Sequence, residues 1–131
     1  MRLSLEDGGI NKEDVGYVNA HGTATAANDT MEAAAIGVVF RDHTKNIGVS
    51  STKSMFGHSL GAAGAIEAAA TVLGLHHSIL PPNANFTELD PACEIDVIAN
   101  TAREKTVDAA ISNSFAFGGL NAVLAFRRWQ G

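Results

Sequence analysis

Short β-type runs alternate with alanine-rich helical segments along this chain, and the alternation limits the folds open to it. The β-type runs span residues 15–20, 47–50, 109–114 and 122–126, with a shorter one at 96–99 inside an otherwise irregular stretch. The helical segments span residues 30–40 and 61–75, after a helix end at 3–7 that Gly8 and Gly9 terminate. The order β-α-β-α-β-β predicts an α/β fold with helices on the faces of a sheet.

Composition restricts the class of protein. The 131 residues are 46% hydrophobic and 18% charged, which is enough apolar material for the core of one domain. The net charge of -5, with no basic run near aromatic residues, argues against a nucleic-acid-binding protein. The apolar stretch 57–75 contains His58 and Glu67, so we expect a buried helix and no membrane span.

A single cysteine, Cys93, excludes an internal disulfide and a cysteine-rich metal site. The first seven residues lack the apolar core of a signal peptide. Both features suit the reducing cytoplasm, which is the predicted location. The neighbours Asp90 and Glu94 raise a thiol pKa, so Cys93 is interpreted as structural and not as a nucleophile.

His21 follows the first β-type run, at the kind of strand end where α/β sheets carry functional residues. Gly22 permits close approach of a ligand. Thr23 and Thr25 alternate along an expected extended segment, so both hydroxyls can face one side and bind a ligand that carries amides. The alternative is a structural histidine held by hydrogen bonds.

His58 lies where the second helical segment is expected to begin, and a helix N-terminus favours a neutral imidazole. A neutral imidazole can donate an N–H to a carbonyl and stabilise an oxyanion or an enolate. Lys53 adds positive charge to the same loop, and Glu67, the only acid in the helix, is its expected partner. The alternative is that Lys53 and Glu67 only neutralise each other.

Other candidate sites carry less information. The sequence contains no His-x-x-x-His pair, and His43, His76 and His77 are expected at the surface, so neither a metal nor a cofactor is expected. Phe115 and Phe117 flank a glycine turn between the last two β-type runs. They either pack the hairpin or form an aromatic gate beside an acyl pocket.

The chain contains four motifs that also occur, in the same order, in a known family. They are VNAHGTAT at residues 18–25, STKSMFGHSLGAAG at 51–64, PPNAN at 81–85 and NSFAFGGLN at 113–121. With these motifs the chain resembles the C-terminal part of β-ketoacyl-acyl-carrier-protein synthases, with the synthase II class the nearest. The resemblance implies that residues 1–131 form one thiolase-like domain, half of a layered α-β-α fold.

The resemblance also implies an acyltransferase reaction of fatty-acid or polyketide elongation. In the family a cysteine from the N-terminal half carries an acyl group, malonyl-acyl carrier protein is decarboxylated, and the enolate attacks the acyl-enzyme. His21 and His58 match the two histidines that stabilise the enolate. Lys53 matches the lysine that organises the site, and Glu67 matches its acidic partner.

The remaining matches concern substrate binding. Thr23 and Thr25 match the threonines that hold the phosphopantetheine arm, so the implied partner is acyl carrier protein and no other cofactor is expected. Phe117 matches the gating phenylalanine and Phe115 its aromatic neighbour. The chain departs from the family pattern at Ala26 in place of proline, at Ala116 in place of glycine, and at Leu120.

The nucleophilic cysteine and the N-terminal half that carries it are absent from this chain. We therefore expect the isolated chain to be inactive and the usual beginning of the fold to lie on other sequence. A half fold exposes apolar surface, so an N-terminal partner half, a homo-oligomer or self-association is expected. The alternative functions are a non-catalytic carrier-protein-binding or assembly module and a truncated gene remnant.

Overall fold

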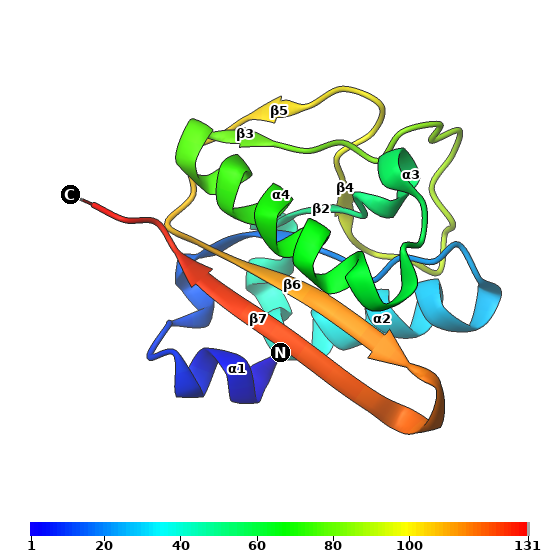
Figure 1. Ribbon diagram of the computed structural model, residues 1–131, viewed down its shortest axis with the longest axis horizontal. Helices are drawn as coiled ribbons and strands as arrows, with labels where there is room; N and C mark the ends of the chain where they lie inside the picture. Colours follow the sequence, from blue (N-terminus) through cyan, green and yellow to red (C-terminus); the bar gives the residue numbers. More distant parts are fainter. Residues whose placement is uncertain (131) are drawn as a thin grey trace.

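The computed structural model describes residues 1–130 and has one main sheet (Figure 1). Its strands lie in the order β4-β2-β1-β6-β7. In that order they span Asp96–Val97, Gly48–Ser50, Val15–Asn19, Ala109–Ala116 and Leu120–Arg127. The first four are parallel, and β7 closes an antiparallel hairpin with β6 at the edge.

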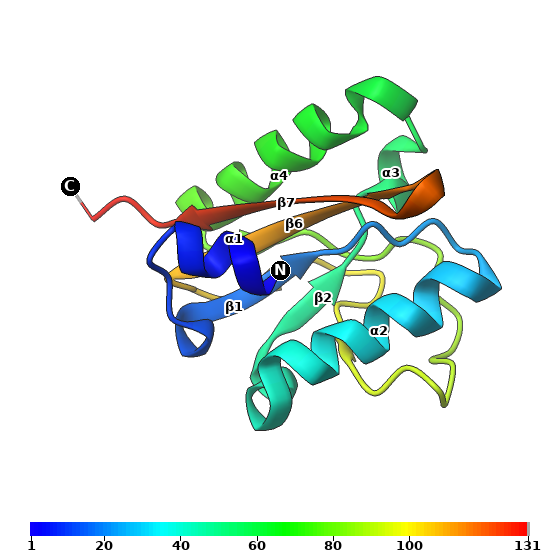
Figure 2. The ribbon, with the colours of Figure 1, turned by 90° about the horizontal axis from the view of Figure 1, so that it is seen from below.

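Helices cover both faces of this sheet. The helices are α1 (Arg2–Asp7), α2 (Ala26–Phe40), α3 (Lys53–Phe56) and α4 (Ala63–His77). Figure 2 shows α2 on one face of the sheet and α4 on the other, with the strands between them. The predicted α/β class and the α-β-α layering are therefore confirmed.

The central strands are buried because both of their faces are covered. All of β2 and the first five residues of β6 are buried, and only Gly16 of β1 is partly exposed. One core cluster includes Val18, Ile36 and Phe40 on the α2 side, and a second includes Tyr17 and Leu75 on the α4 side. These two clusters hold the parallel strands rigidly, so the loops at their ends have a fixed base.

Several predicted boundaries were wrong. The helix predicted from residue 30 begins at Ala26, because the Thr25 hydroxyl caps it. The helix predicted over 61–75 runs from Ala63 to His77, after a 3₁₀ turn at Leu60–Ala62. The two-residue strands β3 (Ile79–Leu80) and β5 (Arg103–Glu104) were missed because such short runs show no periodicity.

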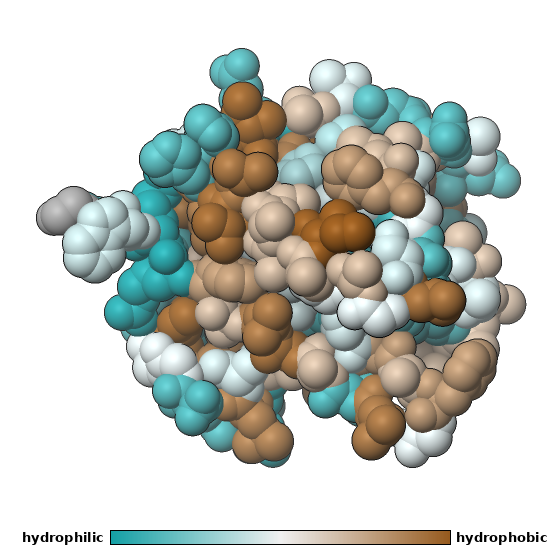
Figure 3. All heavy atoms as spheres, viewed as in Figure 1, coloured by the Kyte–Doolittle hydropathy of each residue, from teal (hydrophilic) through white to brown (hydrophobic). Residues whose placement is uncertain are grey.

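An apolar face remains uncovered. Figure 3 shows hydrophobic residues gathered over the side of the molecule on which α4 and β7 lie. This surface, termed the α4–β7 face, includes Ile66 and Leu73 of α4 and Leu120 and Leu124 of β7, all with more than a third of their surface exposed. Within residues 1–130 no helix is both long enough and apolar enough to cross a membrane.

Candidate active site

The carboxyl ends of the parallel strands bring the predicted residues together. His21 lies two residues beyond β1, Lys53 lies three residues beyond β2, and Phe115 is near the end of β6. Adjacent parallel strands deliver such residues to the same edge of the sheet. The His21 and His58 rings lie with centroids 5.7 Å apart and planes at 90°, and Phe115 lies 5.7 Å from His21.

His21 is held in an environment that disfavours a positive charge. The residue is only 9% exposed. Burial first, and then the positive charge of Lys53, lowers the pKa of His21 below its usual range. The lowered pKa leaves the imidazole neutral near pH 7, so it carries one N–H that can donate to a ligand oxygen.

His58 lies on the exposed loop before α4. Its Nδ1 accepts a hydrogen bond from the backbone N–H of Leu60 at 3.2 Å, which places the proton of the neutral ring on Nε2. Leu60 takes a left-handed backbone conformation, with φ of 51°. His58 was expected directly at the start of the alanine-rich helix, but the 3₁₀ turn Leu60–Ala62 intervenes and α4 begins only at Ala63.

Lys53 and Glu67 form a buried ion pair between α3 and α4. Lys53 Nζ donates to Glu67 Oε1, and their side chains are only 6% and 3% exposed. The predicted pairing is confirmed. Lys53 was expected on a loop, and it instead begins the short helix α3. The pair therefore joins the segment that follows β2 to α4.

The two threonine hydroxyls lie near each other at the start of α2. Thr23 Oγ1 and Thr25 Oγ1 are 3.5 Å apart. The segment is not extended as predicted, because Ala24 between them has a left-handed φ of 58°. Thr25 Oγ1 accepts from the backbone N–H of Asn28 at 3.2 Å, which leaves its own hydroxyl hydrogen free to donate.

The two phenylalanines take different places. Phe115 is half-buried and contacts the histidine pair through His21. Phe117 lies in the hairpin turn Phe117–Gly119 and is fully exposed. The structure therefore brings Phe115 to the site and leaves Phe117 outside it.

Glu32 is a central residue of the site that the sequence did not single out. Its carboxylate is 4% exposed and accepts from the backbone N–H of His21 at 2.9 Å and of Gly22 at 3.0 Å. It also accepts from Asn113 Nδ2 of β6 at 2.9 Å. Glu32 lies four residues before Ile36 on the buried face of α2, and this spacing was the available signal that it points inward.

Replacing Glu32 with alanine should lower the free energy of unfolding by about 3 kcal/mol, because buried N–H donors lose their acceptor. Urea denaturation of the full chain measures the effect. The matched control is Glu13→Ala, at an exposed glutamate with one long contact to Lys12. A loss no larger than that of the control would show that the Glu32 carboxylate does not anchor the His21 loop.

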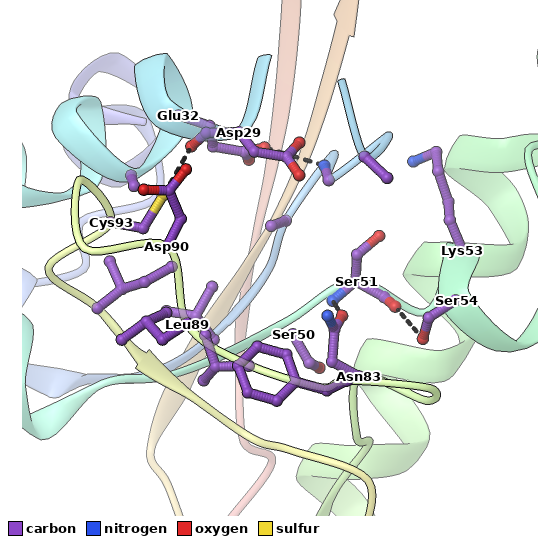
Figure 4. Close-up of a pocket in the computed structure, with 18 of the residues that line it drawn as sticks. Asp29, Glu32, Ser50, Ser51, Lys53, Ser54, Asn83, Leu89, Asp90 and Cys93 are labelled. Carbon is purple, nitrogen blue, oxygen red and sulfur yellow. Dashed lines mark hydrogen bonds between the residues drawn. The ribbon is translucent and has the colours of Figure 1, made fainter. Parts of the chain in front are cut away.

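A cavity of about 530 Å³ adjoins the histidine pair, between α2 and the loop over residues 83–90. Its volume is in the range of small-ligand sites. Figure 4 shows Lys53 and Cys93 on opposite sides of it, with Ser51 and Asn83 between them. Burial, and then Asp90 and Asp29, raise the pKa of the Cys93 thiol, so the thiol is not activated. Residues 1–130 contain no cluster of three metal-ligating side chains.

A layered α/β fold with an imidazole pair and a buried lysine at the strand ends is the arrangement that the resemblance to the condensing enzymes implies. The family model described as β-ketoacyl synthase, C-terminal domain, matches residues 1–87, and the chain belongs to this family. The family predicted from the four motifs is therefore confirmed.

Individual relatives resemble the chain over nearly its whole length. Nodulation protein E of Rhizobium sp. (strain N33) is 53% identical over 98% of this chain and 32% of that protein. The 3-oxoacyl-[acyl-carrier-protein] synthase 2 of Synechocystis sp. is 49% identical over 97% of this chain and 30% of that protein. The chain thus spans about a third of the length of these relatives.

A solved structure shows the same fold. It is a type II polyketide synthase acyl carrier protein in complex with its ketosynthase bound to the hexaketide. The match has a TM-score of 0.95 and 35% sequence identity, and it covers 98% of this chain and 32% of that chain. The expected thiolase-like ketosynthase fold is confirmed by this similarity.

Proposed function

We propose that this chain supplies the His21, His58 and Lys53 part of the active site of a β-ketoacyl-acyl-carrier-protein synthase. The observation that carries the proposal is the perpendicular imidazole pair, with 5.7 Å between ring centroids, at the carboxyl ends of the parallel strands. The reaction is a decarboxylative condensation of malonyl-acyl carrier protein with an acyl-enzyme, in fatty-acid or polyketide elongation.

The two imidazoles act on the malonyl thioester carbonyl. Each donates an N–H to its oxygen, from neutral His21 and from Nε2 of His58. The bond to the malonyl carboxylate breaks, carbon dioxide leaves, and the electron pair remains as an enolate. The enolate carbon then attacks the acyl thioester on the enzyme, a carbon–carbon bond forms, and the cysteine thiolate departs.

The other residues organise this site. The ion pair with Glu67 holds the positively charged ammonium of Lys53 in one position within the site. Thr23 and Thr25 hold the phosphopantetheine arm of acyl carrier protein, which is the proposed partner, and no cofactor takes part beyond that arm. The proposed location of the reaction is the cytoplasm.

Phe115 borders the acyl position beside His21. We assign Phe117 to the gate that the motif predicts, because its turn projects from the end of the β6–β7 hairpin. The gate is complete only when a further polypeptide segment contacts the exposed Phe117 ring.

The nucleophile comes from sequence outside this chain. Cys93 is buried and has a raised pKa, so it does not form the acyl-enzyme. The chain is proposed to be the C-terminal domain of a longer or two-part enzyme. The remaining part packs on the α4–β7 face, whose exposed apolar side chains otherwise favour self-association.

Mixing the chain with the complementary N-terminal region of the Synechocystis synthase should restore condensation, because that region brings the missing nucleophile. The assay follows 3-oxoacyl product from acyl-thioester and malonyl-acyl carrier protein. The isolated chain, treated with acyl-thioester alone, should show no acyl adduct by mass spectrometry.

Three outcomes would contradict the proposal. Stable acylation at Cys93 would make this chain a complete acyl acceptor. Binding of acyl carrier protein by the mixture without turnover, although the complementary region itself becomes acylated, would indicate a non-catalytic module. Failure to associate, with aggregation of the isolated chain, would indicate a gene remnant.

A further inference from the structure

We propose that Asn83 is a positioning residue that holds the segment carrying Lys53 in place beside His21. None of the four motif matches assigns it a role. Its catalytic consequence rests on the proposed function, whereas its structural consequence can be measured in this chain alone.

The Asn83 backbone is fixed on both sides by the segment after β4. Its N–H donates to the Ile98 carbonyl at 2.7 Å, and its carbonyl accepts from the Asn100 N–H at 2.9 Å. It also forms a parallel bridge with Ala99. The side chain therefore projects from a rigid base, and small movements of the surrounding loop do not displace it.

The Asn83 side chain spans from this base to the active-site segment. Its Oδ1 accepts a hydrogen bond from the backbone N–H of Ser51 at 2.9 Å, as drawn in Figure 4. Ser51 is the first residue after β2, where the ladder with β1 ends. Within β2, the neighbouring strands supply the hydrogen-bond partners of the backbone. At Ser51 the Asn83 carboxamide supplies such a partner, so the backbone remains held beyond the end of β2, toward Lys53.

Ser51 in turn forms hydrogen bonds to the segment that carries Lys53 and to the segment that carries His21. Its carbonyl accepts from Ser54 N at 3.1 Å and from Ser54 Oγ at 2.8 Å, which closes the turn that carries Lys53. Ser54 Oγ in turn accepts from Ala84 N at 2.9 Å. The Ser51 hydroxyl donates to the His21 carbonyl at 3.4 Å, so one residue joins the loops of Lys53 and His21.

A displaced Lys53 changes the electrostatics at His21. The charged and titratable groups that face the His21 imidazole are those of Lys53, Glu32, His58 and Asp29. After burial, the Lys53 charge is the largest cause of the lowered pKa of His21. If the segment after β2 moves away, this repulsion weakens and the His21 pKa rises toward its ordinary value.

The test compares three variants of the full chain. Asn83→Ala removes the acceptor, and Asn83→Asp keeps an acceptor oxygen at the same distance. Thr87→Ala is the matched control, because its exposed hydroxyl forms no hydrogen bond within residues 1–130. NMR measures amide hydrogen exchange at Ser51 and the titration of the His21 imidazole. Circular dichroism and thermal unfolding verify that each variant folds.

Asn83→Ala should speed exchange of the Ser51 amide about tenfold, the effect of losing one hydrogen bond, and leave the β1 amides unchanged. It should also raise the His21 pKa, whereas Asn83→Asp restores the protection of Ser51. If Asn83→Ala does not fold, Asn83→Ser serves instead, because its shorter side chain does not reach Ser51.

Unchanged exchange at Ser51 in the folded Asn83→Ala or Asn83→Ser variant would overturn the inference, and so would faster exchange without any change in the His21 titration. In the reconstituted enzyme, the alanine variant should lower kcat about tenfold with little change in KM, and the aspartate variant should recover it. A wild-type mixture without condensation would contradict the proposed function and leave the NMR result to decide the role of Asn83.

Discussion

Replacing either His21 or His58 with alanine in the reconstituted enzyme should slow malonyl decarboxylation by about 100-fold or more, the usual cost of removing one oxyanion donor. The reason is geometric, because the rings are perpendicular with 5.7 Å between centroids, so both can direct an N–H at one oxygen. The effect should appear in kcat, since the negative charge develops only in the transition state.

The measurement follows release of carbon dioxide from malonyl-acyl carrier protein. His76→Ala is the matched control, because His76 is an exposed histidine in the last turn of α4. The double variant His21→Ala/His58→Ala should lose less than the product of the single losses, as groups that act on one charge are not independent. A decarboxylation rate close to wild type in either single variant would refute the assigned roles.

Glu67→Leu should lower the free energy of unfolding by about 3–5 kcal/mol, because it leaves the buried ammonium of Lys53 without its counter-ion. The two side chains are only 6% and 3% exposed, so water cannot replace the lost partner. The double variant Lys53→Met/Glu67→Leu should recover most of the loss, since it removes both charges and retains apolar volume.

Urea denaturation of the isolated chain measures these changes without any assumption about catalysis. The control is Glu6→Ala, which removes the exposed partner of Arg2, a contact of 3.2 Å whose side chains are 73% and 58% exposed. This surface pair should contribute less than about 1 kcal/mol. If Glu67→Leu destabilised the chain no more than Glu6→Ala, the buried pair would not be what joins α3 to α4.

Much of the fold and part of the site could be predicted from local patterns. The strands at 15–20 and 47–50 and the hairpin after 109 were recognised because β-type runs end in clear turn residues. The Lys53–Glu67 pair was predicted because a lone acid in an apolar helix requires a partner. The start of α2 was missed because Thr25 caps it, and the preceding left-handed Ala24 has no sequence signature.

The sequence by itself determined the longer strands and the two long helices, and that His21, Lys53 and Phe115 lie at or just beyond strand ends. Only the tertiary structure decided that Glu32 holds the His21 loop, with Asn113 of β6 as a further partner, and that Asn83 supports Ser51. The physical reason is that periodicity encodes backbone conformation and the buried face, whereas a hydrogen bond between distant segments depends on the order and register of the paired strands.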